Sequence, residues 1–399
     1  MHILLLTQVL PYPPDSGPKI KTWNVLKYLA QHHDVTLVSF VRGDQSADVE
    51  RLRSYCRAVY TVPMERTRVR DGLAMVASLA TGQPWMMVRD ARTAMRRLVD
   101  RLSTEAPFDV VHADQLNMAQ YARQVRKARK VLDAHNALWL LYKRTAATMR
   151  LGPQRLFLER DWRLLKRYEG CAVREFDAVL AVSDEDKMAL LETTGGTRDI
   201  AVIPIAIDVD EVQPVVRKPN PVHILHIGTM YWPPNIDAVL WFAREVYPRI
   251  RQERPDVQFD IVGSRPPAEI IALSKGQSGI NVTGYVADPT LYLERAAAMV
   301  VPLRAGGGMR VKILNAMAQG IPIVSTTLGC EGIDLAPGRD VLIGDSPEEL
   351  AGSVLRVLDD PALADTLSLH SRRSVVAKYD YREACKPLGD IYAGKGVYK

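Results

Sequence analysis

The fold is constrained most by a regular alternation of short apolar runs with amphipathic helical stretches, which recurs along both halves of the 399-residue chain. The first run, residues 3–7, is continuously apolar, as expected of a strand that is buried on both faces of a sheet. Residues 20–31, IKTWNVLKYLAQ, then carry apolar side chains at helical spacing. Strands that alternate with helices predict parallel βαβ units and therefore an α/β fold.

Two series of strands are predicted, one in each half of the chain. The first series comprises residues 3–7, 34–40, 58–63, 108–114, 130–136, 176–184 and 200–208, and the second comprises residues 223–228, 257–263, 280–286, 297–303 and 321–326. Between them, residues 213–221 (QPVVRKPNP) contain three prolines and little apolar pattern, which is typical of a linker. The chain is also longer than one hydrophobic core normally supports. We therefore expect two Rossmann-like domains that face each other across a cleft, divided between residues 212 and 213.

The composition fits a soluble globular protein, with 47% hydrophobic and 25% charged residues. The net charge of +6 suits anionic partners such as phosphorylated substrates, but it also suits a solvated basic surface with no partner. Four cysteines lie far apart without a C-x-x-C pair, so a reducing compartment is expected. The apolar N-terminus is interpreted as a strand rather than a signal peptide, and no run approaches the ~20 apolar residues of a membrane helix.

A turn of three glycines, Gly306 to Gly308, follows a predicted strand and leads into a helix, MRVKILNAMAQG. The free N–H groups and the dipole at a helix N-terminus favour an anion. Arg310 and Lys312 lie in the first turn, where the same dipole disfavours cations, so an anion held between them would explain both. The turn is therefore a candidate phosphate site. The alternative is an ordinary tight turn with two solvated cations.

Other small or polar residues also follow predicted strands, at the edge where doubly wound sheets bind their ligands. They include Gly17 with Lys19, Gly228 with Thr229, and Gly284 with Tyr285, the last pair as a candidate rim for a nucleotide base. His112, in HAD, and His135, in DAHN, end two further strands. Each has a structural alternative, because glycine after a strand is ordinary turn chemistry and a histidine there is often a satisfied structural residue.

The segment PLRAGGGMRVKILNAMAQGIPIVST closely resembles the C-terminal signature of the family-4 retaining glycosyltransferases of the GT-B fold. One branch of that family, linked to bacterial exopolysaccharide and cell-surface synthesis, reads PLR-x-GGG-x-R-x-K-I-L-E-A-M-A-x-G-x-P-V-V-S-T. The similarity extends along the whole chain, from PPDSGPKIKTWNVLKYLA through DAHN to GTMYWPPNIDAVLWF.

The resemblance implies a role for each domain. Residues 1–212, joined by a C-terminal helix at about residues 379–399, would bind the acceptor, which is a glycan or a lipid-linked molecule. Residues 213–378 would bind the donor, a nucleotide-diphosphate-sugar, with no cofactor beyond it. The expected catalytic residues are His135, which would contact the transferred sugar, and Arg310 and Lys312, which would stabilise charge on the leaving diphosphate. The expected substrate-binding residues are Gly17, Lys19, Gly228, Thr229, Tyr285, Gly307, Gly308, Met309 and Asn315. Asp133 and Asn136 are the residues expected to orient His135. No D-x-D motif suited to a metal lies near the site, so no metal is expected.

Three positions depart from the family pattern. Gly307 and Asn315 stand where most members have two glutamates, although the related branch also has the glycine. In the family, the second glutamate accepts hydrogen bonds from the ribose hydroxyls. Asn315 offers one shorter and uncharged acceptor, which would weaken donor binding by about 1–2 kcal/mol. Pro18 replaces the second glycine of the first loop, which removes one N–H donor.

The first half is rich in basic helical sequence. Residues 119–175 carry fourteen Arg or Lys against five acidic residues, mixed with bulky apolar ones, and residues 67–102 are similar. Such helices can lie on an anionic bilayer, so peripheral membrane contact through the basic helices of the first domain is expected. The alternative is a helix packed on the core with a solvated basic face. Nucleic-acid binding is not expected, because the aromatic residues do not form a stacking series.

These observations predict a metal-independent retaining glycosyltransferase of the hexosyltransferase type, which acts in cell-surface or exopolysaccharide synthesis and is cytoplasmic, at the inner face of the membrane. The alternative from another class is a non-catalytic nucleotide-sugar-binding or scaffold subunit of a polysaccharide assembly, which Asn315 favours. A sugar-nucleotide epimerase or a phosphorylase remains a third alternative, although the cofactor lysine site of a phosphorylase has no signal here.

Overall fold

The computed structural model describes residues 1–275 and 278–395, so the last four residues of the expected C-terminal helix lie outside the described part. The chain divides into two compact units. Unit 1 comprises residues 1–206 and the stretch that begins at Ala384, and unit 2 comprises residues 207–383. These boundaries differ by a few residues from those expected. Residues 207–212 join unit 2 because Ile207 forms a β-bridge with Asp380.

Unit 1 contains a seven-stranded sheet in the order β3-β2-β1-β4-β5-β6-β7. Each neighbouring pair is parallel, as the βαβ pattern predicted. The strands are β1 (His2–Thr7), β2 (Asp34–Val41), β3 (Ala58–Pro63), β4 (Val110–Asp114), β5 (Arg129–Asp133), β6 (Ala178–Ala181) and β7 (Ala201–Val202).

Unit 2 contains a six-stranded parallel sheet in the order β10-β9-β8-β11-β12-β13. Its strands are β8 (His223–Ile227), β9 (Gln258–Val262), β10 (Ile280–Gly284), β11 (Ala296–Val301), β12 (Ile323–Ser325) and β13 (Leu342–Ile343). The sequence did not predict β13, because two residues are too short to show a period. All the other strands lie within or next to their predicted ranges, so the two Rossmann-like units are confirmed.

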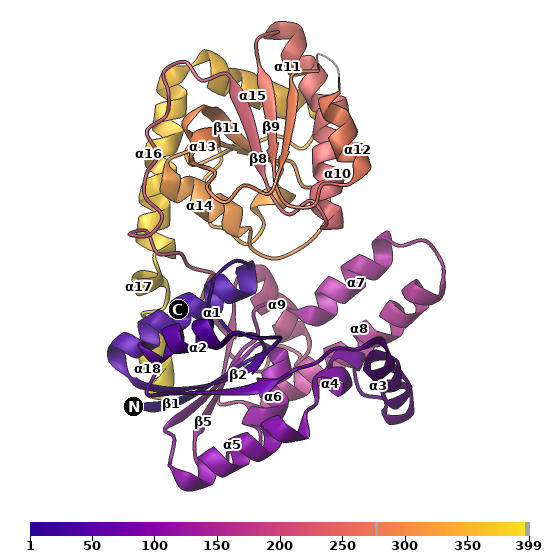
Figure 1. Ribbon diagram of the computed structural model, residues 1–399, viewed down its shortest axis with the longest axis vertical. Coiled ribbons are helices and arrows are strands. Elements are labelled where there is room, and N and C mark those ends of the chain that lie inside the picture. The colour runs from indigo at the N-terminus through magenta and orange to yellow at the C-terminus, as the bar shows by residue number, and fades with distance from the viewer. Residues whose placement is uncertain (276–277, 396–399) are drawn as a thin grey trace. The chain divides into compact units, whose positions relative to one another are not determined.

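Helices pack against the sheet of each unit (Figure 1). Unit 1 has α1 (Gly17–His32), α2 (Ser46–Arg53), α3 (Arg68–Thr81), α4 (Trp85–Asp90), α5 (Thr93–Glu105), α6 (Leu116–Ala122), α7 (Leu138–Thr148), α8 (Pro153–Glu175), α9 (Asp184–Glu192) and the C-terminal α18 (Leu388–Tyr392). Unit 2 has α10 (Pro233–Trp241), a π-helical turn (Phe242–Val246), α11 (Tyr247–Glu253), α12 (Ala268–Ile271), α13 (Thr290–Glu294), α14 (Val311–Gln319), α15 (Pro347–Asp359) and α16 (Pro361–Tyr379), and α17 (Tyr381–Ala384) spans the boundary.

Each unit buries a hydrophobic core of its own. In unit 1 the strand residues Leu4, Val111 and Leu132 pack with helix residues such as Tyr121 and Trp139. In unit 2 the strand residues Ile224, Phe259 and Val300 pack with helix residues such as Phe242 and Leu350. Within the residues described, no helix is both long and apolar enough to cross a membrane.

Candidate functional site

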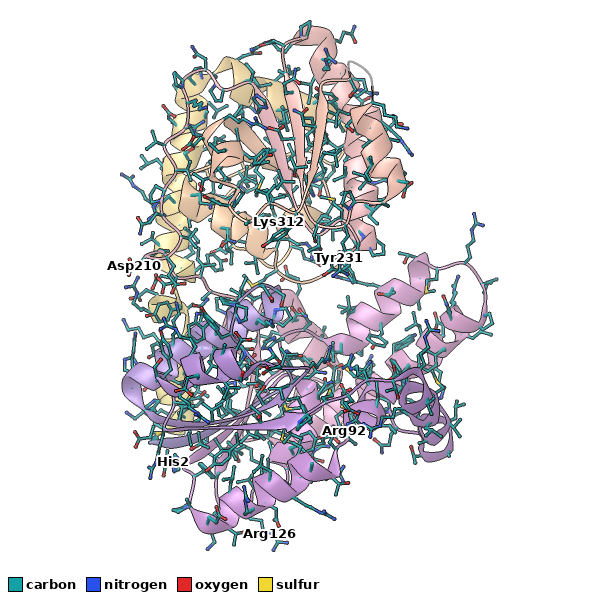
Figure 2. The ribbon with its side chains drawn as sticks, in the orientation of Figure 1. His2, Arg92, Arg126, Asp210, Tyr231 and Lys312 are labelled. Atoms are coloured by element: carbon teal, nitrogen blue, oxygen red, sulfur yellow. The ribbon has the colours of Figure 1, made fainter. Side chains whose placement is uncertain are left out.

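Each sheet has a point where its strand order reverses, and ligands of doubly wound sheets bind at that point, beyond the carboxyl ends of the strands. In unit 1 the reversal lies between β1 and β4, and in unit 2 it lies between β8 and β11. Gly228 follows β8 and the three-glycine turn follows β11, so these two lie at the ends of neighbouring strands, at the reversal of unit 2, whereas Tyr285 follows the edge strand β10. Figure 2 shows Lys312 and Tyr231 at one end of this unit.

The glycine turn is shaped by backbone conformations that suit glycine. Gly306 and Gly308 have φ angles of 115° and 81°, in the region that other residues rarely adopt. The turn is also anchored to α10. The guanidinium of Arg304 donates to both carboxylate oxygens of Asp237, at 3.1 and 2.6 Å, in a bidentate pair. At its other end, Arg310 Nη1 donates to the carbonyl of Gly307 at 2.5 Å. The turn therefore holds a fixed path in front of the N-terminus of α14.

Lys312 lies in the first turn of α14 and reaches the end of β8. Its Nζ donates to Oδ1 of Asn235 at 3.2 Å, and Nδ2 of Asn235 donates to the carbonyl of Thr229 at 3.0 Å. A Cβ atom on Gly228 would lie only 3.1 Å from Nζ of Lys312 and 3.0 Å from Nδ2 of Asn235. The ammonium group of Lys312 can therefore lie here only because Gly228 has no side chain.

The positive charge of Lys312 is unfavourable in its surroundings. Burial, together with the nearby positive charge of Arg310, lowers the pKa of Lys312 to about 7. A lysine whose charge is opposed in this way is relieved by an anion. Beneath it, His226 on β8 is kept neutral, because burial and the charge of Lys312 both lower its pKa well below the ordinary value. Two cations near a helix N-terminus thus form a site suited to phosphate oxygens.

The remaining residues expected on the donor side differ in their burial. Asn315 lies one turn after Lys312 on α14, on the same face, and is half-buried. Its side chain has no hydrogen-bond partner among the residues described, so it is available to a ligand. Met309 is 7% exposed, whereas Thr229 is exposed and Tyr285, after the edge strand β10, is 77% exposed.

His135 in unit 1 has a strained backbone. Its φ angle is 59°, and the N–H of Asn136 donates to the carbonyl of Ala134 at 2.8 Å, which makes a γ-turn centred on His135. Such a conformation is costly for a residue with a side chain and is found mainly at functional sites. The strain favours the predicted functional role of His135 over a purely structural one.

Asp114, rather than Asp133 or Asn136, is the hydrogen-bond partner of His135. Nε2 of His135 lies 2.9 Å from Oδ1 of Asp114, and Oγ1 of Thr22 on α1 donates to Oδ2 of the same carboxylate at 2.9 Å. Asp114 and Asp133 are register partners at the ends of the neighbouring strands β4 and β5, so both carboxylates lie near the end of β5 that leads to His135. The carboxylate nearer in space belongs to the preceding strand.

Asp133 instead belongs to a second buried network. Its Oδ1 lies 3.0 Å from Nζ of Lys21, which also donates to the carbonyl of Ile203, and its Oδ2 lies 3.8 Å from Nε2 of His112. Burial alone would raise the pKa of Asp133, but Lys21 and the neighbouring histidines hold it below the ordinary value. Nδ1 of His112 lies 2.6 Å from the hydroxyl of Tyr392 on α18. His112 is thus a structural residue whose imidazole is neutral, because burial lowers its pKa.

The same region offers one group of side chains that could hold a metal. The ligand atoms of His112, Asp114 and Asp133 lie within 4.8 Å of one another. However, Asp114 is hydrogen-bonded to His135 and Thr22, and the ammonium of Lys21 already neutralises Asp133. The donor atoms therefore have other partners, and the group fits an internal ion pair better than a metal.

The loop after β1 places Gly17 at the first turn of α1, as predicted. Lys19 lies two residues further on, and its Nζ pairs with Asp15 at 3.1 Å. Lys21 is only 1% exposed and is directed into unit 1, so it does not add to the positive charge of the loop.

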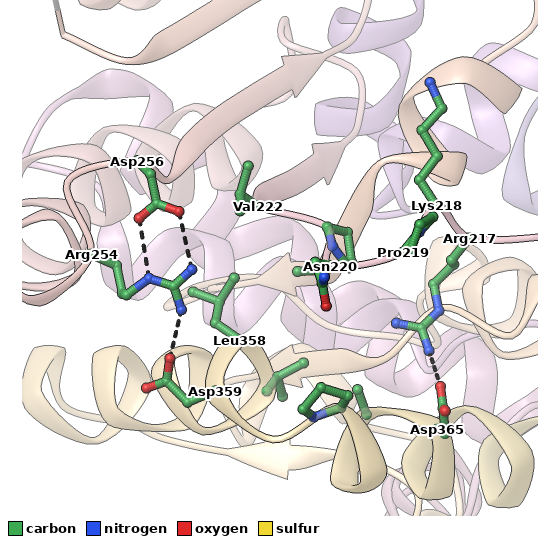
Figure 3. A pocket seen from close by; sticks show the side chains of 15 residues that line it. Arg217, Lys218, Pro219, Asn220, Val222, Arg254, Asp256, Leu358, Asp359 and Asp365 are labelled. Carbon is green, nitrogen blue, oxygen red and sulfur yellow. Dashed lines mark hydrogen bonds and ion pairs between the residues drawn. The ribbon is translucent and has the colours of Figure 1, made fainter.

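A cavity of about 750 Å³ opens elsewhere in unit 2 (Figure 3). It is lined by residues that precede β8, β9 and β11, so it lies at the amino ends of these strands, and none of the predicted site residues lines it. Arg254 pairs with Asp256 and Asp359, and Arg217 pairs with Asp365. These guanidinium groups are already neutralised, so the cavity is less suited to an anion than the glycine turn is.

Sequence reasoning missed Asn235 as a residue of the site. It follows two prolines at the start of α10, where the only local signal is that of a helix start. Its contact with Lys312 spans 77 residues of sequence and arises only when β8 and β11 become neighbours. Asp114 was noted at a strand end, but its pairing with His135 needed the register.

Comparison with known proteins gives the same two-part division. Residues 21–211 match the family described as Glycosyltransferase Family 4, and residues 221–360 match Glycosyl transferases group 1. The chain is 20% identical over 393 residues to an uncharacterized 44.6 kDa protein in the cps region of Klebsiella pneumoniae, covering 96% of this chain and 97% of that one. It is 26% identical over 237 residues, 56% of each chain, to the glycogen synthase of Mycobacterium tuberculosis (strain ATCC 25618 / H37Rv). Among solved structures, Anabaena Alr3699/HepE in complex with UDP is similar, with a TM-score of 0.66, 15% identity and coverage of 98% and 100% of the two chains.

Proposed function

Because the chain belongs to the family-4 glycosyltransferases of the GT-B fold, we propose that it is a retaining enzyme that moves a sugar from a nucleotide-diphosphate donor to a hydroxyl acceptor. The acceptor is a glycan or a lipid-linked molecule. A role in cell-surface or exopolysaccharide synthesis is supported by the match of PLRAGGGMRVKILNAMAQGIPIVST to one branch of the family and by the relative in the cps region.

The observation that carries the proposal is the placement of Lys312 beside Arg310 at the N-terminus of α14. The depressed pKa of Lys312 reports that its positive charge is unfavourable until an anion binds. A nucleoside diphosphate supplies that anion, and UDP is the molecule bound in the Anabaena structure. In this proposal Asn315, one turn along α14, accepts a hydrogen bond from a ribose hydroxyl.

In the proposed reaction, the bond between the anomeric carbon and the β-phosphate oxygen breaks, and the leaving diphosphate takes up the electron pair. Lys312 and Arg310 stabilise the charge that develops there. The acceptor oxygen bonds to the anomeric carbon on the same face, and its proton passes to the diphosphate. His135, held by Asp114, contacts the transferred sugar. No resident metal or cofactor takes part in this scheme, and insensitivity of turnover to EDTA is its check.

The test begins with binding. A thermal-shift panel of UDP-, GDP- and ADP-sugars should reveal one nucleotide that stabilises the protein, by about 2.7 kcal/mol at 100 times its Kd. Lys312→Ala should abolish that shift, whereas Lys218→Ala, at an exposed lysine of the same unit, should leave it unchanged. Absence of a shift with every nucleotide would contradict the proposal.

Asn315 keeps a second function under consideration, that of a non-catalytic nucleotide-sugar-binding or scaffold subunit. The two functions differ in turnover, because a binder would be stabilised by the nucleotide and would release no free sugar or product. Asn315→Glu restores the family residue. If that variant binds the donor more tightly but neither protein hydrolyses or transfers the sugar, the binder is the better description.

We also propose that the protein works in the cytoplasm, where nucleotide-sugars are made. Fractionation of cells should place it in the cytoplasmic or the inner-membrane fraction.

A further inference from the structure

Helix α3 presents its large hydrophobic side chains to solvent rather than to the core of unit 1. Four large apolar side chains face solvent, with exposures of 73% for Val69, 64% for Leu73, 65% for Val76 and 60% for Leu79. The residues that α3 buries against unit 1 are small, Ala74 and Ser78. The spacing of the exposed residues places them on one side of the helix, opposite the small ones. We call these four side chains the α3 apolar face.

The exposure of this face does not come from a loosely held helix. Oγ1 of Thr67 caps the N-terminus by accepting from the N–H of Arg70, and Gly82 ends the helix in the left-handed conformation. On the buried side, Arg160 of α8 donates to the carbonyl of Ser78 at 2.6 Å. The α3 apolar face is therefore presented on a fixed helix, and contiguous exposed apolar surface of this kind marks an interaction site.

The surroundings of the face are basic. Arg68 and Arg70 at its N-terminal end are exposed and have no acidic partner in the described part of the chain, and Asp71, the one acid of α3, is half-buried. Residues 144–158, which include the turn between α7 and α8, carry three cations and no acid. Figure 1 shows α3 beside α8.

Two further apolar side chains, near the start of α8, are exposed. Leu156 is 66% exposed and lies one turn before Arg160, the residue that binds α3. Leu151, in the turn that precedes α8, is 84% exposed.

We propose that the α3 apolar face, with the basic residues around it, docks onto an anionic lipid bilayer. Apolar side chains flanked by arginines suit a bilayer surface. The apolar side chains can enter the interfacial region, and the guanidinium groups can pair with lipid phosphates. A second copy of the chain would bring the same unpaired arginines, and the one acid of α3, Asp71, is half-buried, so charge favours the lipid.

The α3 apolar face lies within residues 67–102, one of the two stretches expected from sequence to contact a membrane. The other was the basic stretch at residues 119–175. Much of that stretch is engaged within unit 1. Lys143 and Lys166 lie over the rings of Trp139 and Trp162, at 4.3 to 5.6 Å from the ring centroids. Leu165 is fully buried. The side chains left to meet a membrane are those of α3 and of the turn before α8.

The test measures co-sedimentation of the full-length protein with vesicles of phosphatidylcholine alone, and with vesicles that contain about 30% phosphatidylglycerol, in low and high salt. Binding should appear with the anionic vesicles and weaken in high salt. Val69→Ser/Leu73→Ser/Val76→Ser/Leu79→Ser should reduce binding at least about tenfold, and Arg68→Gln/Arg70→Gln should reduce it with the face intact. A matched control, Met188→Ser/Leu369→Ser, removes exposed apolar side chains of 64% and 51% exposure elsewhere and should bind as the wild type does.

The readout does not depend on the sugar-transfer reaction, so its failure is distinguishable from a failure of the proposed function. All four substituted side chains are exposed, so unfolding temperature and nucleotide binding should be unchanged in the fourfold variant. The proposal is overturned if neither vesicle binds the protein or if the fourfold variant binds equally well. It is also overturned if light scattering shows a dimer that this variant converts to a monomer, because the occupant would then be a second copy.

Discussion

The charge state of Lys312 is set by its surroundings, and this makes donor binding sensitive to pH. Its pKa of about 7 in the free protein should rise when a diphosphate binds, because the anion stabilises the ammonium. At a pH above that pKa, Lys312 is neutral in the unliganded protein, and it must take up a proton when the nucleotide binds. We therefore expect nucleotide affinity to fall as pH rises above about 7, by up to about tenfold per pH unit.

Calorimetric titration at about pH 8, in two buffers of different ionisation enthalpy, measures this proton uptake directly. Lys312→Arg is the control, because arginine keeps its charge throughout this range and should bind without taking up a proton. Wild-type binding with no proton uptake would contradict the assignment of the low pKa to the diphosphate site.

Gly263 is required by the close approach of two strand ends. A Cβ atom at this position would lie 1.7 Å from the carbonyl oxygen of Gly228, which is backbone and cannot move aside. Gly263→Ala should therefore lower the free energy of unfolding by about 3 kcal/mol or more, and should disturb the placement of Gly228 in the donor site. Urea unfolding and nucleotide binding measure the two effects.

Gly352→Ala is the matched control for this substitution. Gly352 lies inside α15, and beyond the neighbouring backbone of that helix nothing lies within 4 Å of an added Cβ, so alanine should be neutral or stabilising by about 0.5–1 kcal/mol. Equal unfolding curves for the two variants would show that the contact between Gly263 and Gly228 relaxes easily.

Residue types could be predicted from the sequence, but their partners could not. Arg310 and Lys312 were apparent because two cations opened a helix after three glycines, and His135 was apparent because it ended a strand. Asp114 and Asn235 are defined by contacts across strands, which no local pattern encodes. Lys21 has the sequence context of a surface lysine and yet lies buried against Asp133.

Helix α18 is tied to the sheet of unit 1 by a buried hydrogen bond of Tyr392 and by Arg129, whose Nε donates to the carbonyl of Ile391 at 2.8 Å. Burial, aided by the charge of Asp133, raises the pKa of Tyr392 well above its ordinary value, so its hydroxyl stays protonated and donates to Nδ1 of His112. Tyr392→Phe would leave that nitrogen buried without a partner. We expect the free energy of unfolding of unit 1 to fall by about 1–3 kcal/mol. Tyr231→Phe, at a tyrosine that is 57% exposed, should have no such effect.

Circular dichroism during urea unfolding, with both variants side by side, measures this difference. A Tyr392→Phe protein as stable as the Tyr231→Phe protein would mean that α18 is held by its other contacts, among them the hydrogen bond from Arg129.

Helices and strands whose apolar residues recur with a clear period were predicted from the sequence, and those without such a period were not. The parallel strands of both sheets carry continuous apolar runs, which mark them in the sequence. The strand β13 has two residues, and the C-terminal segment expected as one helix from about residue 379 is broken into α17 and α18. Helix α3 was recognised as a mixture of apolar and basic residues, but the direction of its apolar side depends on what packs beneath Ala74 and Ser78.

The two units should behave as separate cooperative domains. Each has its own sheet and its own buried core, and unit 1 is closed by residues from both ends of the chain. Residues 213–221, which were expected to be the linker, form no helix or strand, but they lie within unit 2, which begins at residue 207. Calorimetry should therefore resolve two unfolding transitions, one for each unit.

A nucleotide should shift only one of the two transitions, because the proposed diphosphate site is made of residues of unit 2. At 100 times its Kd, the nucleotide should stabilise that transition by about 2.7 kcal/mol and leave the other in place. Lys312→Ala should abolish the shift. Tyr392→Phe should lower the unfolding temperature of unit 1 without changing the response of unit 2 to the nucleotide. A single transition that moves as a whole with nucleotide would show that the two units unfold together, and a shift of the Tyr392-dependent transition alone would place the nucleotide in unit 1.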